Sequence, residues 1–204
     1  MNEKEVRNIL ISQLYFTQDS LYKIENFCRE VIEYNKKFNL ISRSTENQIW
    51  DRHVLDSAQL VKFIDFNKDL SLSDLGTGAG FPGIVLAIFN KNKDFHVKLY
   101  EKSPIKRDFL NENIKKLQIG AETFSNIYEE ELDSDFVVCR AFKKIDKIIQ
   151  VSREIIKKPH KLIVLKGKRA QEDLNKAFKS QKYHYKIEQS ITDKDSKIII
   201  IYFN

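Results

Sequence analysis

The segment DLGTGAGFPG, residues 74–83, holds four of the six glycines in this chain of 204 residues. Glycine is favoured where φ is positive or where a ligand must approach the main chain closely. Residues 71–76 predict a short strand, and residues 82–90 predict a helix with Pro82 in its first turn. A strand, a glycine-rich turn and a helix in this order predict a ligand site at the carboxyl edge of a parallel sheet. A purely structural turn that packs the helix on the strand is the alternative.

Strand and helix patterns alternate after this turn. Strands are predicted over residues 96–101, 121–126, 135–141 and 160–167, with helices over 103–119 and 145–158 between them. This alternation predicts a mostly parallel sheet of seven strands with right-handed crossovers. The last two strands, 183–191 and 196–203, are separated only by TDKD. This connection is too short for a crossover, so the sheet is expected to end in an antiparallel hairpin.

The residues before the first strand predict helices. Between residues 21 and 32 the apolar side chains recur on one face of an amphipathic helix, with Asp19 or Ser20 as the expected cap. A further helix is expected within residues 49–64. The chain is therefore expected to consist of an N-terminal helical extension, residues 1–66, packed on an α/β domain, residues 67–204.

Composition limits the class of protein. Hydrophobic residues make up 42% of the chain and charged residues 31%, as in globular proteins. The longest apolar stretches, 81–89 and 198–203, are shorter than the roughly 20 residues of a membrane span. No secretory signal is recognised at the N-terminus, so a cytoplasmic protein is expected. The spacing of two cysteines, Cys28 and Cys139, and of four histidines predicts neither a disulfide nor a metal site.

The glycines fit two cofactor motifs. Residues 78–83 match the dinucleotide pattern G-x-G-x-x-G, whereas residues 76–80, preceded by an aspartate, match the pattern of S-adenosylmethionine (SAM) methyltransferases. The dinucleotide register places Pro82 where helix N–H groups would meet a pyrophosphate, and no length remains for the substrate domain of a dehydrogenase. Glu101, at the end of the next strand, suits the ribose hydroxyls of either cofactor. The SAM register therefore predicts cofactor contacts at Asp74, Gly76, Gly78, Gly80 and Glu101.

Several segments together resemble a known family. They are YNKKFNLIS (34–42), RHVLDS (52–57), DLGTGAGFPGIVLAI (74–88), EKSPIKRDFL (101–110), CRAF (139–142) and LKG (165–167). In this order and spacing they are similar to the bacterial small-subunit ribosomal RNA methyltransferase G family, also called glucose-inhibited division protein B. The resemblance implies a SAM-dependent methyltransferase (Rossmann-like) fold and methyl transfer to N7 of a guanine in 16S ribosomal RNA. It also implies SAM contacts at Gly76, Phe81, Glu101, Tyr128, Glu129 and Arg140.

The expected chemistry needs no general base, because N7 of guanine is a lone-pair nucleophile with no proton to lose. In agreement, CRAF stands where amino-group methyltransferases carry an Asn/Asp-Pro-Pro-aromatic motif. Arg140 is the expected catalytic residue, engaging the SAM carboxylate or an RNA phosphate through two hydrogen bonds. Cys139 offers the alternative of covalent cytosine-C5 chemistry, although its apolar context predicts a buried thiol.

The net charge of +6 is compatible with a polyanionic partner, and equally with the lysine bias of A·T-rich coding. Seven residues are expected around the cleft, where they would neutralise RNA phosphates: Arg52, His53, Lys106, Arg107, Lys166, Lys168 and Arg169. Asp56 is expected to cap a helix or to pair with Arg52.

The expected partner is 16S ribosomal RNA or the assembling small ribosomal subunit, and the protein is expected to be a monomer. Two other functions remain open on the same fold. One is a SAM- or RNA-binding module without catalysis. The other is a small-molecule methyltransferase that uses the N-terminal helices as a lid.

Overall fold

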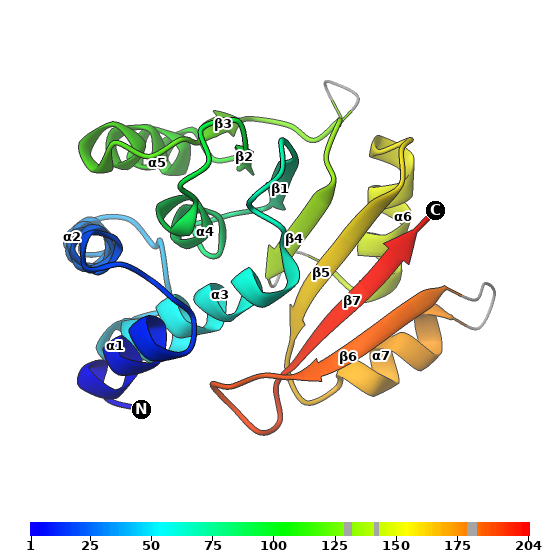
Figure 1. Cartoon of the computed structure of the whole chain (residues 1–204), viewed down its shortest axis with the longest axis horizontal. Helices are drawn as coiled ribbons and strands as arrows, with labels where there is room; N and C mark the ends of the chain where they lie inside the picture. Colours follow the sequence, from blue (N-terminus) through cyan, green and yellow to red (C-terminus); the bar gives the residue numbers. More distant parts are fainter. Residues whose placement is uncertain (129–131, 141–142, 179–182) are drawn as a thin grey trace.

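A seven-stranded sheet forms the centre of the molecule (Figure 1). The computed structural model describes residues 1–128, 132–140, 143–178 and 183–204. The strands are β1 (Ser71–Leu75), β2 (His96–Tyr100), β3 (Glu122–Phe124), β4 (Phe136–Arg140), β5 (His160–Lys166), β6 (His184–Gln189) and β7 (Lys197–Phe203). They lie in the order β3-β2-β1-β4-β5-β7-β6. Strand β7 is antiparallel to both of its neighbours, and the other pairs are parallel.

The predicted antiparallel end of the sheet is confirmed. Strands β6 and β7 pair from His184 opposite Tyr202 to Gln189 opposite Lys197, and β7 also pairs with β5. The strand order reverses at β1, which lies between β2 and β4. Such a reversal opens a crevice outside the carboxyl ends of the two strands on either side of it, which is where open α/β sheets bind ligands. The topology therefore indicates a ligand site at the carboxyl ends of β1 and β4.

Helices cover both faces of the sheet (Figure 1). One face carries α1 (Glu3–Ser12), α2 (Gln18–Asn35), α4 (Gly83–Phe89) and α5 (Pro104–Leu117), and the other carries α6 (Ile145–Ile155) and α7 (Ala170–Ala177). Among the described residues, no helix combines the length and the apolar character needed to cross a membrane.

The two faces form two hydrophobic clusters, because successive strand residues point to opposite sides of a sheet. In β4, Phe136 and Val138 belong to the cluster under α4 and α5, whereas Val137 and Cys139 belong to the cluster under α6. The N-terminal helices join the first cluster, in which Phe27 of α2 is completely buried. Residues 1–66 thus share a core with the sheet.

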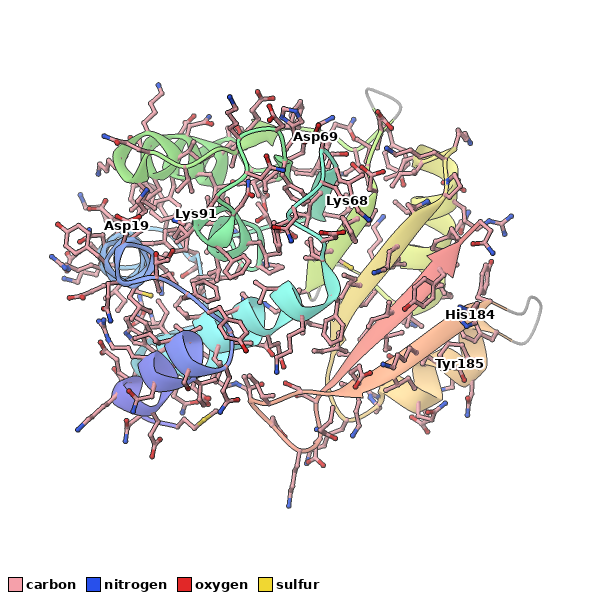
Figure 2. All side chains as sticks on the ribbon, viewed as in Figure 1. Asp19, Lys68, Asp69, Lys91, His184 and Tyr185 are labelled. Atoms are coloured by element: carbon pink, nitrogen blue, oxygen red, sulfur yellow. The ribbon has the colours of Figure 1, made fainter. Side chains whose placement is uncertain are left out.

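Polar contacts reinforce this packing at the surface. Asp19 of α2 and Lys91, just after α4, form an ion pair of 3.6 Å, and both are labelled in Figure 2. Because both side chains are largely exposed, their attraction is screened by water and is expected to contribute under about 1 kcal/mol. The apolar contacts therefore account for most of the attachment of α2 to α4.

The structure differs from the local predictions in three places. Helix α2 begins at Gln18 and is capped by Thr17, whose hydroxyl oxygen accepts from the Ser20 N–H at 3.1 Å, so neither Asp19 nor Ser20 is the cap. The predicted helix within residues 49–64 is a π-helical turn, Trp50–Leu55, followed by α3 (Asp56–Ala58) and a 3-10 turn, Gln59–Phe63. Helix α7 was not predicted, because only two of its eight residues are buried.

Packing explains two glycines of the glycine loop, residues 76–83. A Cβ on Gly80 would lie 2.6 Å from Cγ1 of Ile84 and 3.0 Å from Cζ of Phe27, and Gly80 has a φ of +101°. A Cβ on Gly83 would lie 2.2 Å from Cδ2 of Leu99. The side chains that crowd the Cβ position of Gly80 are the protein's own, so packing within the core is enough to require a glycine here.

Replacing Gly80 with alanine should lower the free energy of unfolding by about 2 kcal/mol, because the methyl group would overpack the core at a positive φ. The matched control is Gly120→Ala, whose Cβ would meet nothing within 4 Å and which should stay within about 1 kcal/mol of the parent. Urea denaturation measures both. Equal stabilities of the two variants would contradict the packing role of Gly80.

Candidate functional site

The buried carboxylate of Asp74 binds the glycine loop from the side of the core. Asp74, at the end of β1, is inaccessible to solvent, and its Oδ2 accepts from the Thr77 hydroxyl at 2.5 Å and from the Gly83 N–H at 2.8 Å. Burial raises the pKa of Asp74 to about 6, although both hydrogen bonds act in the opposite direction. Asp74 thus binds the backbone of the loop from the core side, and its Oδ1 has no hydrogen-bond partner among the described residues.

The upper side of the loop offers open main chain. Gly76 and Gly78 have φ values of 71° and 61°, and the N–H groups of Gly76 and Thr77 both donate to the Tyr100 carbonyl at the end of β2. A Cβ on Gly78 would meet only the Gly76 carbonyl oxygen, at 4.0 Å. Among Gly78, Gly80 and Gly83, Gly78 is therefore the glycine whose main chain a ligand can approach.

A second carboxylate lies beside this open backbone. Oε2 of Glu101, just after β2, accepts from the Gly78 N–H at 3.0 Å, and Oε1 accepts from the Ser103 N–H at 2.8 Å. Ser103 precedes α5, and Pro104 occupies the first turn of that helix. The structure thus brings Glu101 next to Gly78, as the strand-to-strand spacing predicted.

Two other predicted cofactor residues lie in contrasting environments. Phe81 is 3% exposed and packs on the rings of Phe27 and His53, with centroids 5.2 and 5.1 Å away. Tyr128, which follows β3, is 53% exposed. Glu129 lies outside the described residues. Phe81 therefore supports the loop from the core, while Tyr128 is accessible from outside.

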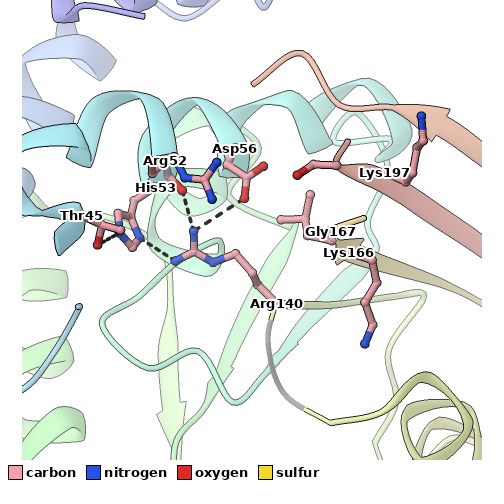
Figure 3. Close-up of a pocket in the computed structure, with 10 residues that line it drawn as sticks. Thr45, Arg52, His53, Asp56, Arg140, Lys166, Gly167 and Lys197 are labelled. Carbon is pink, nitrogen blue, oxygen red and sulfur yellow. Dashed lines mark hydrogen bonds and ion pairs between the residues drawn. The ribbon is translucent and has the colours of Figure 1, made fainter. Parts of the chain in front are cut away.

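Arg140, at the carboxyl end of β4, connects the loop to the N-terminal segment (Figure 3). Its Nη1 donates to the Arg52 carbonyl oxygen at 2.9 Å, and its Nη2 donates to Nδ1 of His53 at 2.7 Å. Its guanidinium carbon lies 5.6 Å from the centroid of the Phe81 ring. These contacts join β4 to Arg52, His53 and the glycine loop, so Arg140 positions these elements relative to one another.

His53 is neutral, and its partners fix the tautomer. Because Arg140 only donates, Nδ1 of His53 must accept, which leaves the proton on Nε2 to donate to the Thr45 hydroxyl at 2.9 Å. The Thr45 hydroxyl donates in turn to the Ser42 carbonyl at 2.8 Å. Burial, with the nearby charges of Arg140 and Arg52, lowers the pKa of His53 to about 3. A buried neutral imidazole cannot neutralise a phosphate, which corrects the expectation for His53.

Asp56 joins the same cluster instead of pairing with Arg52. Its Oδ2 lies 3.7 Å from Nη1 of Arg140, and its Oδ1 accepts from Nε2 of Gln59 at 3.0 Å and from the Thr192 hydroxyl at 3.2 Å. Burial raises the pKa of Asp56, and the charge of Arg140 opposes this. These contacts tie the N-terminal segment to the connection between β6 and β7.

Arg52 makes a second tie to this connection. Its Nη1 lies 3.4 Å from Oδ2 of Asp193, a residue 141 positions away in the chain. The predicted Arg52–Asp56 pair is therefore replaced by an ion pair that spacing within one helix cannot reveal. Arg52 stays partly exposed, with 43% of its side chain accessible.

A cavity of about 320 Å³ lies beside Arg140, outside the carboxyl ends of β4 and β5 (Figure 3). We call it the Arg140 cavity. It is lined by Thr45, Arg52, His53, Asp56, Arg140, Leu165, Lys166, Gly167, Ser196 and Lys197. Asp56 is the one carboxylate among these residues, against four cationic side chains. The cavity therefore suits a polar ligand that carries negative charge.

The remaining predicted RNA-binding residues differ in their partners. Arg107 donates through Nη1 to the carbonyl oxygens of Glu101 and Lys102, both at 2.8 Å, and so braces the connection between β2 and α5. Lys168 pairs with Asp195 at 2.9 Å, and Lys166 lies 3.6 Å from Asp173. Lys106 and Arg169 form no ion pair within the described part of the chain.

Cys139 is fully buried in the cluster under α6, on the face of the sheet away from α4. Burial raises the pKa of its thiol, which disfavours the thiolate that a nucleophile requires. Its position therefore excludes the covalent alternative for this residue. Within the described ranges, no group of three or more His, Cys, Asp or Glu residues is arranged to hold a metal ion.

The His53 ring should stay neutral from pH 8 down to pH 5 in the folded protein. Since its folded pKa lies below the unfolded value of 6.5, the unfolded chain takes up the proton first. His53 therefore contributes stability that is complete above about pH 6.5 and is lost as pH falls towards 3. Nitrogen-15 NMR of the ring, assigned with His53→Gln, measures the tautomer and the titration. A titration midpoint near 6.5 would refute this assignment, whereas Arg140→Ala should move the midpoint upward.

Solved structures share this fold. A SAM-dependent methyltransferase from Aquifex aeolicus superposes with a TM-score of 0.63 at 12% identity, covering 87% of this chain and 98% of that one. A predicted O-methyltransferase from Agrobacterium tumefaciens gives a TM-score of 0.57 at 16% identity, covering 74% and 80% of the two chains. At these identities the similarity establishes the fold alone, which is the predicted SAM-dependent methyltransferase fold.

Sequence comparison is more specific. A family model described as GidB, rRNA small subunit methyltransferase G, matches residues 20–200. A protein of Rickettsia felis named ribosomal RNA small subunit methyltransferase G is 37% identical over 183 residues, 89% of this chain and 93% of that protein. Its namesake in Pelagibacter ubique is 34% identical over 190 residues, 90% of this chain and 89% of that protein. The chain therefore belongs to the rRNA small subunit methyltransferase G family.

Proposed function

We propose that this protein transfers a methyl group from SAM to N7 of a guanine in 16S ribosomal RNA. The observation that carries the proposal is the open main chain of Gly78 beside the Glu101 carboxylate, at the point where the strand order reverses. Membership of the rRNA small subunit methyltransferase G family supports the reaction and the substrate class. The choice of N7 rests on the resemblance of several segments to this family, and it agrees with CRAF in place of the Asn/Asp-Pro-Pro-aromatic motif of amino-group methyltransferases.

The residues around Gly78 fit SAM. Gly76 and Gly78 would receive the cofactor against main chain, and Glu101 would accept from the ribose hydroxyls. Each oxygen of Glu101 accepts one backbone hydrogen bond and keeps a lone pair for another donor. When bound, SAM supplies a methyl group on a positively charged sulfur. Tyr128 and Glu129 remain proposed contacts, while Asp74, Gly80 and Phe81 would act by shaping the loop.

The start of α4 argues against a dinucleotide. A pyrophosphate at a helix N-terminus needs free N–H groups. Here Pro82 has no N–H, the Gly83 N–H donates to Asp74 at 2.8 Å, and the Ile84 N–H donates to the Gly80 carbonyl at 2.8 Å. SAM carries no phosphate and makes no such demand. The hydrogen bonds of this turn therefore favour the SAM register over the dinucleotide register.

The Arg140 cavity is the proposed place of the target nucleotide. Glu101 lies at the end of β2 and the cavity lies outside β4 and β5, with β1 between them. A ligand that extends from Glu101 across β1 would present its other end to this cavity. Because N7 has no proton to lose, the residues here must align the base instead of moving a proton. Arg140 would serve alignment by holding His53, the Arg52 carbonyl and Phe81 together.

The proposal also implies where the protein works. Ribosomal RNA is made and assembled in the bacterial cytoplasm, which is therefore the proposed location. One chain supplies both the SAM site and the Arg140 cavity, which supports the expectation of a monomer. Each part of the proposed site is thus available without a second copy.

Incubating the purified protein with labelled SAM and unmodified 16S ribosomal RNA, or the small subunit, should yield 7-methylguanosine on mass-spectrometric analysis of the nucleosides. A binding module would retain SAM and transfer nothing. A small-molecule enzyme would show activity without RNA and little dependence on salt. Either result, or a methyl group at another atom of the base, would contradict the proposal.

Gly78→Val should abolish SAM binding, because the side chain would fill the open approach at a φ of +61°. Glu101→Ala should weaken binding about tenfold or more, because a charged acceptor for the ribose hydroxyls is lost. Gly120→Val is the matched control, since that position is open and lies outside the loop. Calorimetric titration measures all three. Unchanged SAM affinity in both loop variants would place the cofactor elsewhere.

A further inference from the structure

A second cavity, of about 520 Å³, lies between the start of α6 and helix α7. We call it the α6–α7 cavity. Its lining is dominated by basic side chains, and the residues are Lys143, Lys144, Ile145, Asp146, Lys166, Arg169, Asp173 and Lys176. Among these described residues there are five cations and two carboxylates, an excess of three positive charges. Three of these cations, Lys143, Lys144 and Lys176, were not among the predicted RNA-binding residues.

Three of the five cations have no ion-pair partner among the described residues. Asp173 has a cationic partner in Lys166, 3.6 Å away. Among the described residues, Lys144, Arg169 and Lys176 form no ion pair, although cations on other surfaces do, such as Lys116 with Glu30 at 2.8 Å. Like charges that gather without partners repel one another and attract anions. The charge of the α6–α7 cavity therefore favours binding of a negatively charged ligand.

The two cavities share a wall. Lys166, at the carboxyl end of β5, lines both the Arg140 cavity and the α6–α7 cavity. Its Nζ lies 3.4 Å from the Lys143 carbonyl oxygen, on the α6 side. A nucleotide that enters the Arg140 cavity as part of a longer strand would thus carry its flanking backbone past Lys166.

We propose that the α6–α7 cavity binds backbone phosphates of the RNA strand next to the target nucleotide. This inference rests on the proposed function for the identity of the strand. Lysine and arginine side chains bind phosphates without reading bases, so the cavity would fix the register of the strand and leave base selection to the Arg140 cavity. Lys168, already paired with Asp195, lies outside this set.

The salt dependence of RNA binding tests this site directly. Each neutralised phosphate contributes about 0.7 to the slope of log affinity against log salt for single strands, and about 0.9 for duplex. The variant Lys144→Ala/Lys176→Ala should therefore make the slope shallower by about 1.5. The charge-matched control is Lys62→Ala/Lys93→Ala. Both lysines are exposed and lack ion pairs among the described residues, and Lys93 precedes β2, which β1 and β4 separate from β5. The control should keep the parent slope.

Both double variants should keep the SAM affinity of the parent, because none of the four lysines touches the glycine loop. Equal changes in slope for the two pairs would mean that only net charge matters, and no change for either pair would mean that RNA does not reach the cavity. Both results overturn the proposal. Binding of inorganic phosphate that is lost in Lys144→Ala/Lys176→Ala while the RNA slope stays unchanged would identify a small-anion site and also overturns it.

The single variants keep the test available if a double variant fails to fold. Lys144→Ala and Lys176→Ala should each change the slope by about 0.7, and Lys62→Ala and Lys93→Ala should leave it unchanged. Methyl transfer by the parent protein is measured separately. If the parent transfers no methyl group, the proposed function fails, while the comparison of slopes still decides whether this cavity binds RNA.

Discussion

The carboxylate of Asp74 accepts from the Thr77 hydroxyl near the start of the glycine loop and from the Gly83 N–H at its end. This brace holds the loop folded over the end of β1, with Gly80 packed into the core and Gly78 facing outward. The same contact occupies the first N–H of α4 and so removes the donor that a pyrophosphate would use. The buried side chain of Asp74 thus shapes the loop and disfavours ligands that need a free N–H at the start of α4.

The second connection runs through Arg140. Its guanidinium holds the Arg52 carbonyl and a neutral His53, and it lies over Phe81 of the loop. Hydrogen bonds extend this cluster to Ser42. Asp56, whose Oδ2 lies 3.7 Å from Nη1 of Arg140, links the cluster to the Thr192 hydroxyl. A buried charge with several partners is costly to disturb. Residues 42–56 are thereby fixed against the carboxyl edge of the sheet, where Thr45, Arg52, His53 and Asp56 form one wall of the Arg140 cavity.

Local patterns in the sequence were sufficient to predict the strand, turn and helix around the loop and the antiparallel end of the sheet. They also predicted the position of Glu101 beside the glycines. The features that were missed depend on contacts between distant segments. Gly80 is crowded by Phe27 of α2, His53 loses its charge through burial near Arg140, and Arg52 pairs with Asp193. Lys144 and Lys176 read as ordinary solvated lysines until the fold brings them to one cavity. The spacing of residues along the chain does not predict contacts between segments that are distant in the sequence.

The most direct test of the Asp74 brace is the SAM affinity of Asp74→Asn and Asp74→Ala, measured by calorimetry on folded protein. Asparagine keeps an oxygen that can accept from Gly83 and Thr77, so its affinity should stay within a few-fold of the parent. Alanine leaves the Gly83 N–H without its acceptor, so the loop should relax and the affinity should fall about tenfold or more. An alanine variant that binds SAM as tightly as the parent would contradict the account.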